Sequence, residues 1–209
     1  MTTARKVASI LLETKAVKLS PSKPFQWSSG WKSPIYCDNR ITLSDVESRT
    51  FIKKALSKLI KRAFPEAEGI AGVATAGIAQ GALVADYLKL PFAYVRPKPK
   101  EHGMGNQIEG RIEQGQKVVV LEDLISTGGS SLKAVEALRA AGVEVIGMVA
   151  IFTYGFKLAD DNFDEYGVQL KTLSNYKFLI DEAVNQNYVA ESDLESLKKW
   201  RQNPAKWEG

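Results

Sequence analysis

Short segments that are apolar throughout alternate along this chain with segments in which apolar residues recur at helical spacing. The apolar segments lie at residues 69–74, 92–95, 117–121 and 143–152. Helical spacing is found at 44–63, through Leu83, Val84 and Leu88, and at 130–141. Strands that are apolar on both faces are typical of a parallel sheet covered by helices on both sides. The sequence therefore predicts an α/β fold with a central, mostly parallel sheet flanked by helices.

This alternation places every strand-to-helix turn at one edge of the sheet. Parallel strands joined by right-handed crossovers end at the carboxyl edge, where open α/β sheets bind ligands. Smaller elements are expected around this core: a first helix with Val7, Ile10 and Leu11 on one face, a capping box at 44–47, and a helical tail after Ser174 with a second cap at 192–195. We expect one domain, residues 1–209, in which about the first 40 residues form a small N-terminal appendage.

The composition excludes several classes of protein. The 28 basic and 24 acidic residues give a net charge of +4 without a polybasic arm, so no nucleic-acid partner is expected. One cysteine excludes an intrachain disulfide and favours a reducing compartment, and one histidine argues against a zinc site. No apolar run approaches about 18 residues, and the N-terminal apolar segment is too short for a secretory signal. We therefore expect a cytoplasmic protein that does not bind a membrane.

Residues 118–131, VVVLEDLISTGGSS, have the features of an anion site. Gly128 and Gly129 allow backbone N–H groups to converge, and Thr127, Ser130 and Ser131 add hydroxyl donors. The helix expected to follow directs its positive end at the same point. Neither a GxxxxGK[ST] loop nor a GxGxxG loop occurs in the chain, so a monophosphate is expected here and not a nucleotide polyphosphate.

Two acids, Glu122 and Asp123, directly precede this loop. They would repel a phosphate that touched them, but they can accept hydrogen bonds from sugar hydroxyls or hold Mg²⁺ through water. A ribose 5-phosphate would satisfy both halves of the motif. The alternative is a strand that ends in solvent-exposed acids before a glycine-rich helix start.

Two other segments are candidates for anion binding. The turn Thr75-Ala76-Gly77 exposes backbone amides at the same sheet edge, although tight packing of strand on helix also explains its small residues. Residues 96–106, RPKPKEHGMGN, place four potential cations within seven residues of a long loop. Such a loop is either a lid that closes over an anionic substrate or a solvated charge cluster.

Together these segments resemble the type I phosphoribosyltransferases, and among them the members that use orotate. The quoted 118–131 motif resembles the family's signature for phosphoribosyl pyrophosphate (PRPP), RPKPKEHG its mobile catalytic loop, and ATAG its pyrophosphate turn. FQWSSGWKSPIY, residues 25–36, resembles the hood that recognises orotate. The resemblance implies the type I fold with a hood at about 1–40 and a mobile catalytic loop at 96–115.

The resemblance also implies an activity. The enzyme would transfer the 5-phosphoribosyl group from PRPP to orotate, giving orotidine 5′-phosphate and pyrophosphate in pyrimidine biosynthesis. Mg²⁺ would be the cofactor, held mainly by PRPP and water near Glu122 and Asp123 and not by a direct protein site. A homodimer would share the catalytic loop across subunits.

Residue roles carry over only where the motifs match. Lys100 and His102 would act on the pyrophosphate leaving group, with Asp123 as the third catalytic residue. PRPP would be bound by Thr75, Ala76, Gly77, Arg96, Lys98, Lys100, His102, Glu122, Asp123, Ser126, Thr127, Gly128, Gly129, Ser130 and Ser131. Orotate would be bordered by Ser28, Tyr36, Ser126 and Tyr154.

Three positions depart from the family's pattern. Ser28 stands where many members have lysine, Pro97 where many have a second basic residue, and Thr153-Tyr154-Gly155 where an arginine commonly binds the orotate carboxylate. Lys98 is a substitute for the second of these, and Lys32 is a candidate for the carboxylate. The sequence does not settle how that carboxylate is bound, the kinetic order, the oligomer beyond a dimer, or the role of the C-terminal tail.

Three other functions remain open from sequence. A phosphoribosyltransferase for another base would keep the PRPP chemistry with a different hood. A non-catalytic PRPP-sensing regulator would add a nucleic-acid-binding element, whereas Lys53, Lys54, Lys58 and Lys61 are spread around one helix. A simple sugar-phosphate binder would have little need of a cationic lid.

Overall fold

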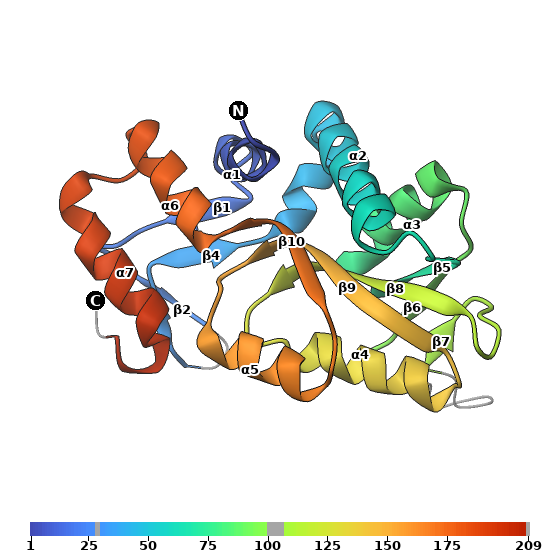
Figure 1. The fold of residues 1–209 in the computed structure, drawn as a ribbon. Helices are drawn as coiled ribbons and strands as arrows, with labels where there is room; N and C mark the ends of the chain where they lie inside the picture. The colour runs from blue at the N-terminus through green and yellow to red at the C-terminus, as the bar shows by residue number, and fades with distance from the viewer. Residues whose placement is uncertain (28–29, 100–106, 208–209) are drawn as a thin grey trace.

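The computed structural model describes residues 1–27, 30–99 and 107–207. Its centre is a six-stranded sheet with the order β10-β9-β8-β5-β6-β7 (Figure 1). The strands are β5 (Gly69–Val73), β6 (Phe92–Val95), β7 (Ile108–Glu109), β8 (Lys117–Ile125), β9 (Glu144–Thr153) and β10 (Leu170–Asn175). All neighbours pair in parallel except β7, which lies antiparallel to β6 at the edge. The predicted mostly parallel sheet is confirmed.

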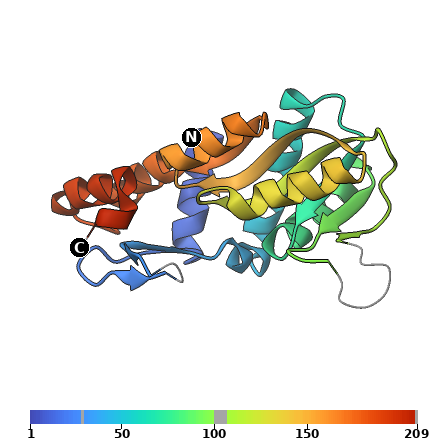
Figure 2. The ribbon, with the colours of Figure 1, turned by 90° about the horizontal axis from the view of Figure 1, so that it is seen from below.

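Helices cover both faces of this sheet, as Figures 1 and 2 show. On one face lie α1 (Thr3–Glu13), α2 (Val46–Ala63), α3 (Ala76–Leu88) and α6 (Tyr176–Asn185), and on the other α4 (Gly129–Ala140) and α5 (Lys157–Glu165). Each face has its own cluster of buried apolar side chains. The central strands therefore contribute side chains to both clusters, which explains why they are apolar throughout.

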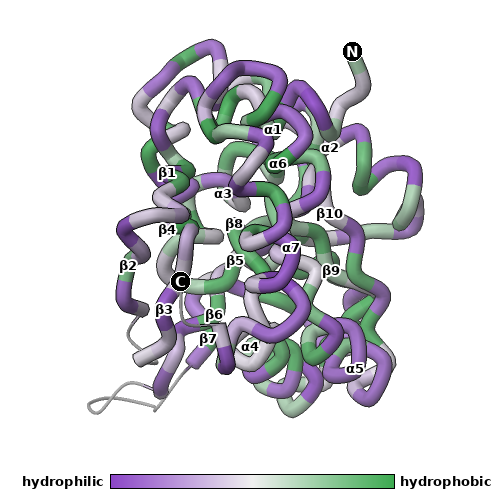
Figure 3. Tube along the Cα trace, turned by 90° about the vertical axis from the view of Figure 1, so that its left-hand side faces the viewer, coloured by the Kyte–Doolittle hydropathy of each residue, from purple (hydrophilic) through white to green (hydrophobic). Residues whose placement is uncertain are grey.

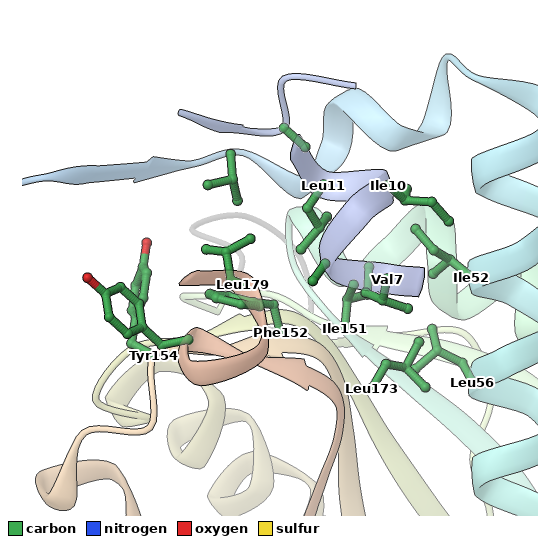
Figure 4. Packing of buried hydrophobic residues seen from close by; sticks show 14 of the residues in the cluster. Val7, Ile10, Leu11, Ile52, Leu56, Ile151, Phe152, Tyr154, Leu173 and Leu179 are labelled. Carbon is green, nitrogen blue, oxygen red and sulfur yellow. The ribbon is translucent and has the colours of Figure 1, made fainter. Parts of the chain in front are cut away.

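The predicted N-terminal helix is confirmed as α1, and it belongs to the larger cluster. Val7 and Leu11 are fully buried, and Figure 4 shows them with Ile151 of β9 and Leu56 of α2. Since apolar residues at a spacing of three and four share one helix face, this face of α1 is covered by the rest of the cluster.

Two small antiparallel ribbons lie outside the central sheet. One pairs β1 (Val17–Leu19) with β4 (Ile35–Cys37), and the other pairs β2 (Phe25–Gln26) with β3 (Lys32–Ser33). The segment η1 (Asn39–Leu43) connects β4 to α2. Figure 3 shows these ribbons on the side of the molecule where α7 (Leu194–Gln202) also lies.

Several boundaries differ from those expected from sequence. The strand predicted at 117–121 continues to Ile125, so the two acids lie on β8 and do not follow it. Asp45, not Ser44, caps α2, and its side chain accepts from Ser48 N at 2.8 Å. Ser192 lies within η2 (Glu191–Asp193) and is not a cap, and a further turn, η3 (Pro204–Lys206), follows α7. Three further elements, β7, β10 and α5, were not predicted from the sequence.

Candidate active site

The two turns with anion-binding features lie side by side at the carboxyl edge, because β5 and β8 are neighbours. A Cβ atom on Gly77 would come within 2.5 Å of the carbonyl oxygen of Leu121 on β8. Only glycine allows α3 to begin so close to that strand. Tight packing of α3 on β8 therefore explains the glycine at position 77. Thr75 is exposed and Ala76 partly exposed in the same turn.

The loop between β8 and α4 presents a free helix N-terminus. Gly128 has a φ of +83° and precedes the first turn of α4, which has no side-chain cap. Helix α5 supports this loop. A Cβ on Gly128 would meet the Phe163 ring at 2.7 Å, and Asn162 Nδ2 donates to Thr127 O at 2.8 Å. Gly129 and Ser130 are exposed, and nothing lies within 4 Å of a Cβ built on Gly129. The uncapped amides of α4 are therefore positioned to bind an anion.

Glu122 is a buried acid with two internal hydrogen bonds. Its side chain is 6% exposed. Its Oε1 accepts from Asp123 N at 3.0 Å, and its Oε2 accepts from Ser131 Oγ at 3.1 Å. Burial, with the nearby charge of Asp123, raises the pKa of the Glu122 carboxyl well above its usual range. Glu122 thus joins the end of β8 to the first turn of α4.

Asp123 is less buried and is held through its backbone. Its carbonyl accepts from Asn39 Nδ2 at 2.8 Å, and Asn39 Oδ1 in turn accepts from Cys37 Sγ at 3.2 Å. Burial raises the pKa of Asp123, and hydrogen bonding with the Glu122 side chain and the charge of Arg40 oppose that rise. Asn39, 1% exposed, was not predicted from sequence, since its partner lies 84 positions away.

A cavity of about 210 Å³ opens between the ends of β5 and β6 and the first turns of α4. It is lined by Val73, Ala74, Val95, Arg96, Pro97, Gln107, Ser130, Lys133 and Ala134. Two residues predicted from the sequence, Arg96 and Ser130, line this cavity. Lys133 also lines it and was not predicted. Arg96 Nη1 also pairs with Glu109 Oε1 at 3.4 Å, and Lys98 is exposed beyond the cavity.

The residues predicted to border the base lie on two elements. Tyr36 is 43% exposed on β4, and Ser126 is half-buried directly after β8. Tyr154 is only 2% exposed, with its ring 5.3 Å from Trp27 and 5.6 Å from Trp200. Burial raises the pKa of the Tyr154 hydroxyl well above its usual range. Tyr154 is therefore part of an aromatic wall and not a free side chain.

Three predicted site residues, Ser28, Lys100 and His102, lie outside the described residues. Within residues 1–27, 30–99 and 107–207, no group of three or more His, Cys, Asp or Glu side chains could hold a metal ion. In the same part of the chain, no helix has the length and apolar character needed to cross a membrane.

Comparison with known proteins identifies the family. The model of the phosphoribosyl transferase domain matches residues 47–187. An orotate phosphoribosyltransferase of Cytophaga hutchinsonii is 60% identical over 207 residues, which cover 99% of each chain. This chain belongs to the orotate phosphoribosyltransferases. The enzyme of that name from Listeria monocytogenes is 58% identical over 99% of both chains.

Solved structures agree with this assignment. The orotate phosphoribosyltransferase of Aeropyrum pernix has a TM-score of 0.73 and 30% identity, covering 84% of this chain and 98% of that one. The UMP synthase of Leishmania donovani has a TM-score of 0.80 over 95% of this chain and 42% of its own. At 22% identity the second match shows the fold alone. The expected type I phosphoribosyltransferase fold is confirmed.

The buried state of Glu122 predicts a measurable pH dependence of stability. Its folded-state pKa lies above the ordinary 4.5, so the folded protein holds a proton that the unfolded chain releases. The free energy of unfolding should therefore fall as pH rises from 4.5 toward the raised pKa, by at most about 1.4 kcal/mol per pH unit for this group. Glu122→Gln should lose this contribution because glutamine does not titrate. Its amide can keep both hydrogen bonds by accepting from Asp123 N and donating to Ser131 Oγ.

Urea unfolding of wild type and variant at several pH values measures the difference. Glu66→Gln, at an exposed glutamate, is the matched control and should follow wild type. If the free energy of unfolding has the same pH dependence in wild type and Glu122→Gln, the pKa of the Glu122 carboxyl is not raised.

Proposed function

We infer that this chain transfers the 5-phosphoribosyl group of PRPP to orotate, giving orotidine 5′-phosphate and pyrophosphate in pyrimidine biosynthesis. The observation that carries the proposal is the juxtaposition, on β8 and α4, of an acid pair with an uncapped helix N-terminus. A sugar phosphate needs acceptors for its hydroxyls and donors for its phosphate, and this edge supplies both. The relatives at 54–60% identity carry the name of this activity.

The 5-phosphate of PRPP is assigned to Thr127, Gly128, Gly129, Ser130 and Ser131. Gly129 and Ser130 are exposed and the space beside the Cα of Gly129 is open, which supports this assignment. Glu122 and Asp123 remain the proposed partners of the ribose hydroxyls, but they differ in burial and therefore in role. Asp123, partly exposed, presents its carboxylate to the sugar, while the buried Glu122 fixes the loop through Ser131.

Pyrophosphate is assigned to Thr75, Ala76, Gly77, Arg96 and Lys98, completed by Lys100 and His102. The cavity between the ends of β5 and β6 supports this placement, since it already joins Arg96 to Ser130. The leaving group carries several negative charges, so cations around it lower the barrier to its departure.

Mg²⁺ fits a site in which the substrate supplies most ligands. Glu122 and Asp123 are the carboxylates at this edge, and Mg²⁺ is commonly held by one or two carboxylates together with substrate phosphates and water. When bound, the ion offsets charge on the pyrophosphate. The residues of the chain orient PRPP and exclude water around it.

Orotate is assigned to the space between the hood and the carboxyl edge, bordered by Ser28, Tyr36, Ser126 and Tyr154. Its ring nitrogen attacks C1 of the ribose as the bond to pyrophosphate breaks. The protein forms no covalent bond in this step. Alignment of the two substrates supplies up to about 7–11 kcal/mol in favourable cases, and closure of the 96–115 loop excludes water.

The proposal extends to the organisation of the protein. Residues 1–209 form a single domain with a hood at about 1–40, and two copies form a dimer in which each supplies Lys100 and His102 to the other's site. The single cysteine of the sequence fits a cytoplasmic enzyme.

The activity is tested by the loss of orotate absorbance when PRPP and Mg²⁺ are added together. We expect turnover with orotate, none on omission of either reagent, and no pyrophosphate release with adenine, hypoxanthine or uracil. Turnover with one of those bases in place of orotate would show that the base assignment is wrong. PRPP binding with no turnover on any base would instead favour a PRPP-sensing regulator.

The shared site is tested with two variants that are each defective. Lys100→Ala should lose about 10²–10³ in rate with a smaller effect on PRPP affinity, and Asp123→Asn should lose activity as well. Co-expression with different tags gives hybrid dimers in which one site has both an intact Asp123 and an intact Lys100. The mixture should recover up to about a quarter of the wild-type rate. A mixture no faster than either variant alone would argue against sharing.

A further inference from the structure

Orotate carries a carboxylate, and none of the four residues assigned to border it, Ser28, Tyr36, Ser126 and Tyr154, is a cation. The neighbouring carboxylate of Asp123 repels an anion, so a cation from another element is needed. We propose that Arg201, from the C-terminal helix α7, binds the carboxylate of orotate. This inference rests on the proposed function and identifies a residue that determines its substrate specificity.

Arg201 lies over the turn that follows β9. Its Nη2 donates to Gly155 O at 3.1 Å. A Cβ built on Gly155 would lie 3.5 Å from Nη2 and 3.6 Å from Nε of Arg201. The guanidinium therefore occupies the space that a side chain at position 155 would enter, at the carboxyl edge and next to Tyr154.

The preceding residue anchors this guanidinium. Trp200 is fully buried, and its ring lies 5.6 Å from both Trp27 and Tyr154 and 5.3 Å from Phe156. Trp27 directly precedes position 28 of the hood. Trp200 thus fixes the end of α7 against the two segments proposed to border the base, the hood and the turn after β9.

The charge of Arg201 is available to a ligand. Among the described residues its side chain contacts a neutral carbonyl and forms no ion pair with an acid. A guanidinium has five N–H donors and matches a carboxylate with two parallel hydrogen bonds. Arg40, another cation near Asp123, is already paired with Asp38 at 2.7 and 2.9 Å. Its charge is therefore compensated within the hood.

Arg201 also borders a second feature, a recess of about 350 Å³ between α6 and α7. Lys198 lines the same recess and is exposed, one turn before Arg201 on α7. In the part of the chain that the structure describes, the hydrogen bond from α7 to the turn after β9 comes from Arg201 and not from Lys198. A Lys198→Gln variant therefore removes a positive charge from the same helix and recess without touching the proposed carboxylate contact.

The test measures KM and kcat for each substrate, with the other saturating, in wild type, Arg201→Gln, Arg201→Lys and Lys198→Gln. We expect Arg201→Gln to raise the KM for orotate by about tenfold or more, and the KM for PRPP by less than about twofold. Arg201→Lys should recover part of the loss because it keeps the charge but not the planar fork. Lys198→Gln should match wild type, and inhibition by uracil, which lacks the carboxylate, should be the same in all four proteins.

The outcomes separate this inference from the function on which it rests. A wild-type enzyme that does not use orotate would contradict the proposed function itself. If wild type uses orotate, an unchanged KM for orotate in Arg201→Gln would overturn the role of Arg201, as would equal rises for both substrates. A fifth protein, Lys32→Gln, is measured in the same way. A rise in its KM for orotate without one in Arg201→Gln would overturn the proposal and assign the carboxylate to Lys32.

Discussion

The site depends on the two hydrogen bonds that the buried carboxylate of Glu122 accepts. One comes from the backbone of Asp123 and the other from Ser131 on α4. They fix the distance between Asp123 and the N-terminus of α4. A carboxylate is costly to bury, and its raised pKa records that cost. The fold itself therefore sets the position of Asp123 relative to the loop between β8 and α4.

Three other parts of the chain are built around this unit. The turn at Gly77 approaches β8 so closely that its Cβ is excluded, which brings the second anion turn beside the first. The hood is connected through Asn39 to the backbone of Asp123. The C-terminal helix α7 is connected through Trp200 to Tyr154 and Trp27. Segments from both ends of the chain thus meet where the proposed base would lie.

The sequence predicted the central strands and helices because their apolar patterns reflect local burial. It placed the end of β8 too early, since two acids suggested solvent, whereas pairing of Glu122 with Ala150 and of Leu124 with Phe152 continues the strand. It missed β10, whose one exposed edge and mixed residues, Leu170–Asn175, give no continuous apolar run. Asn39 and Arg201 could not be found in this way, because their contacts join positions 84 and 46 residues apart.

Titration of PRPP with Mg²⁺ into the protein, followed by calorimetry, tests most directly the claim that this edge binds a sugar phosphate through Asp123. Wild type should bind PRPP, and Asp123→Asn should weaken that binding by about tenfold or more, as expected for loss of hydrogen bonds to a charged group. Asp86→Asn, at an exposed position on α3, should leave the affinity unchanged. No PRPP binding by wild type, or equal affinities of wild type and Asp123→Asn, would contradict the account.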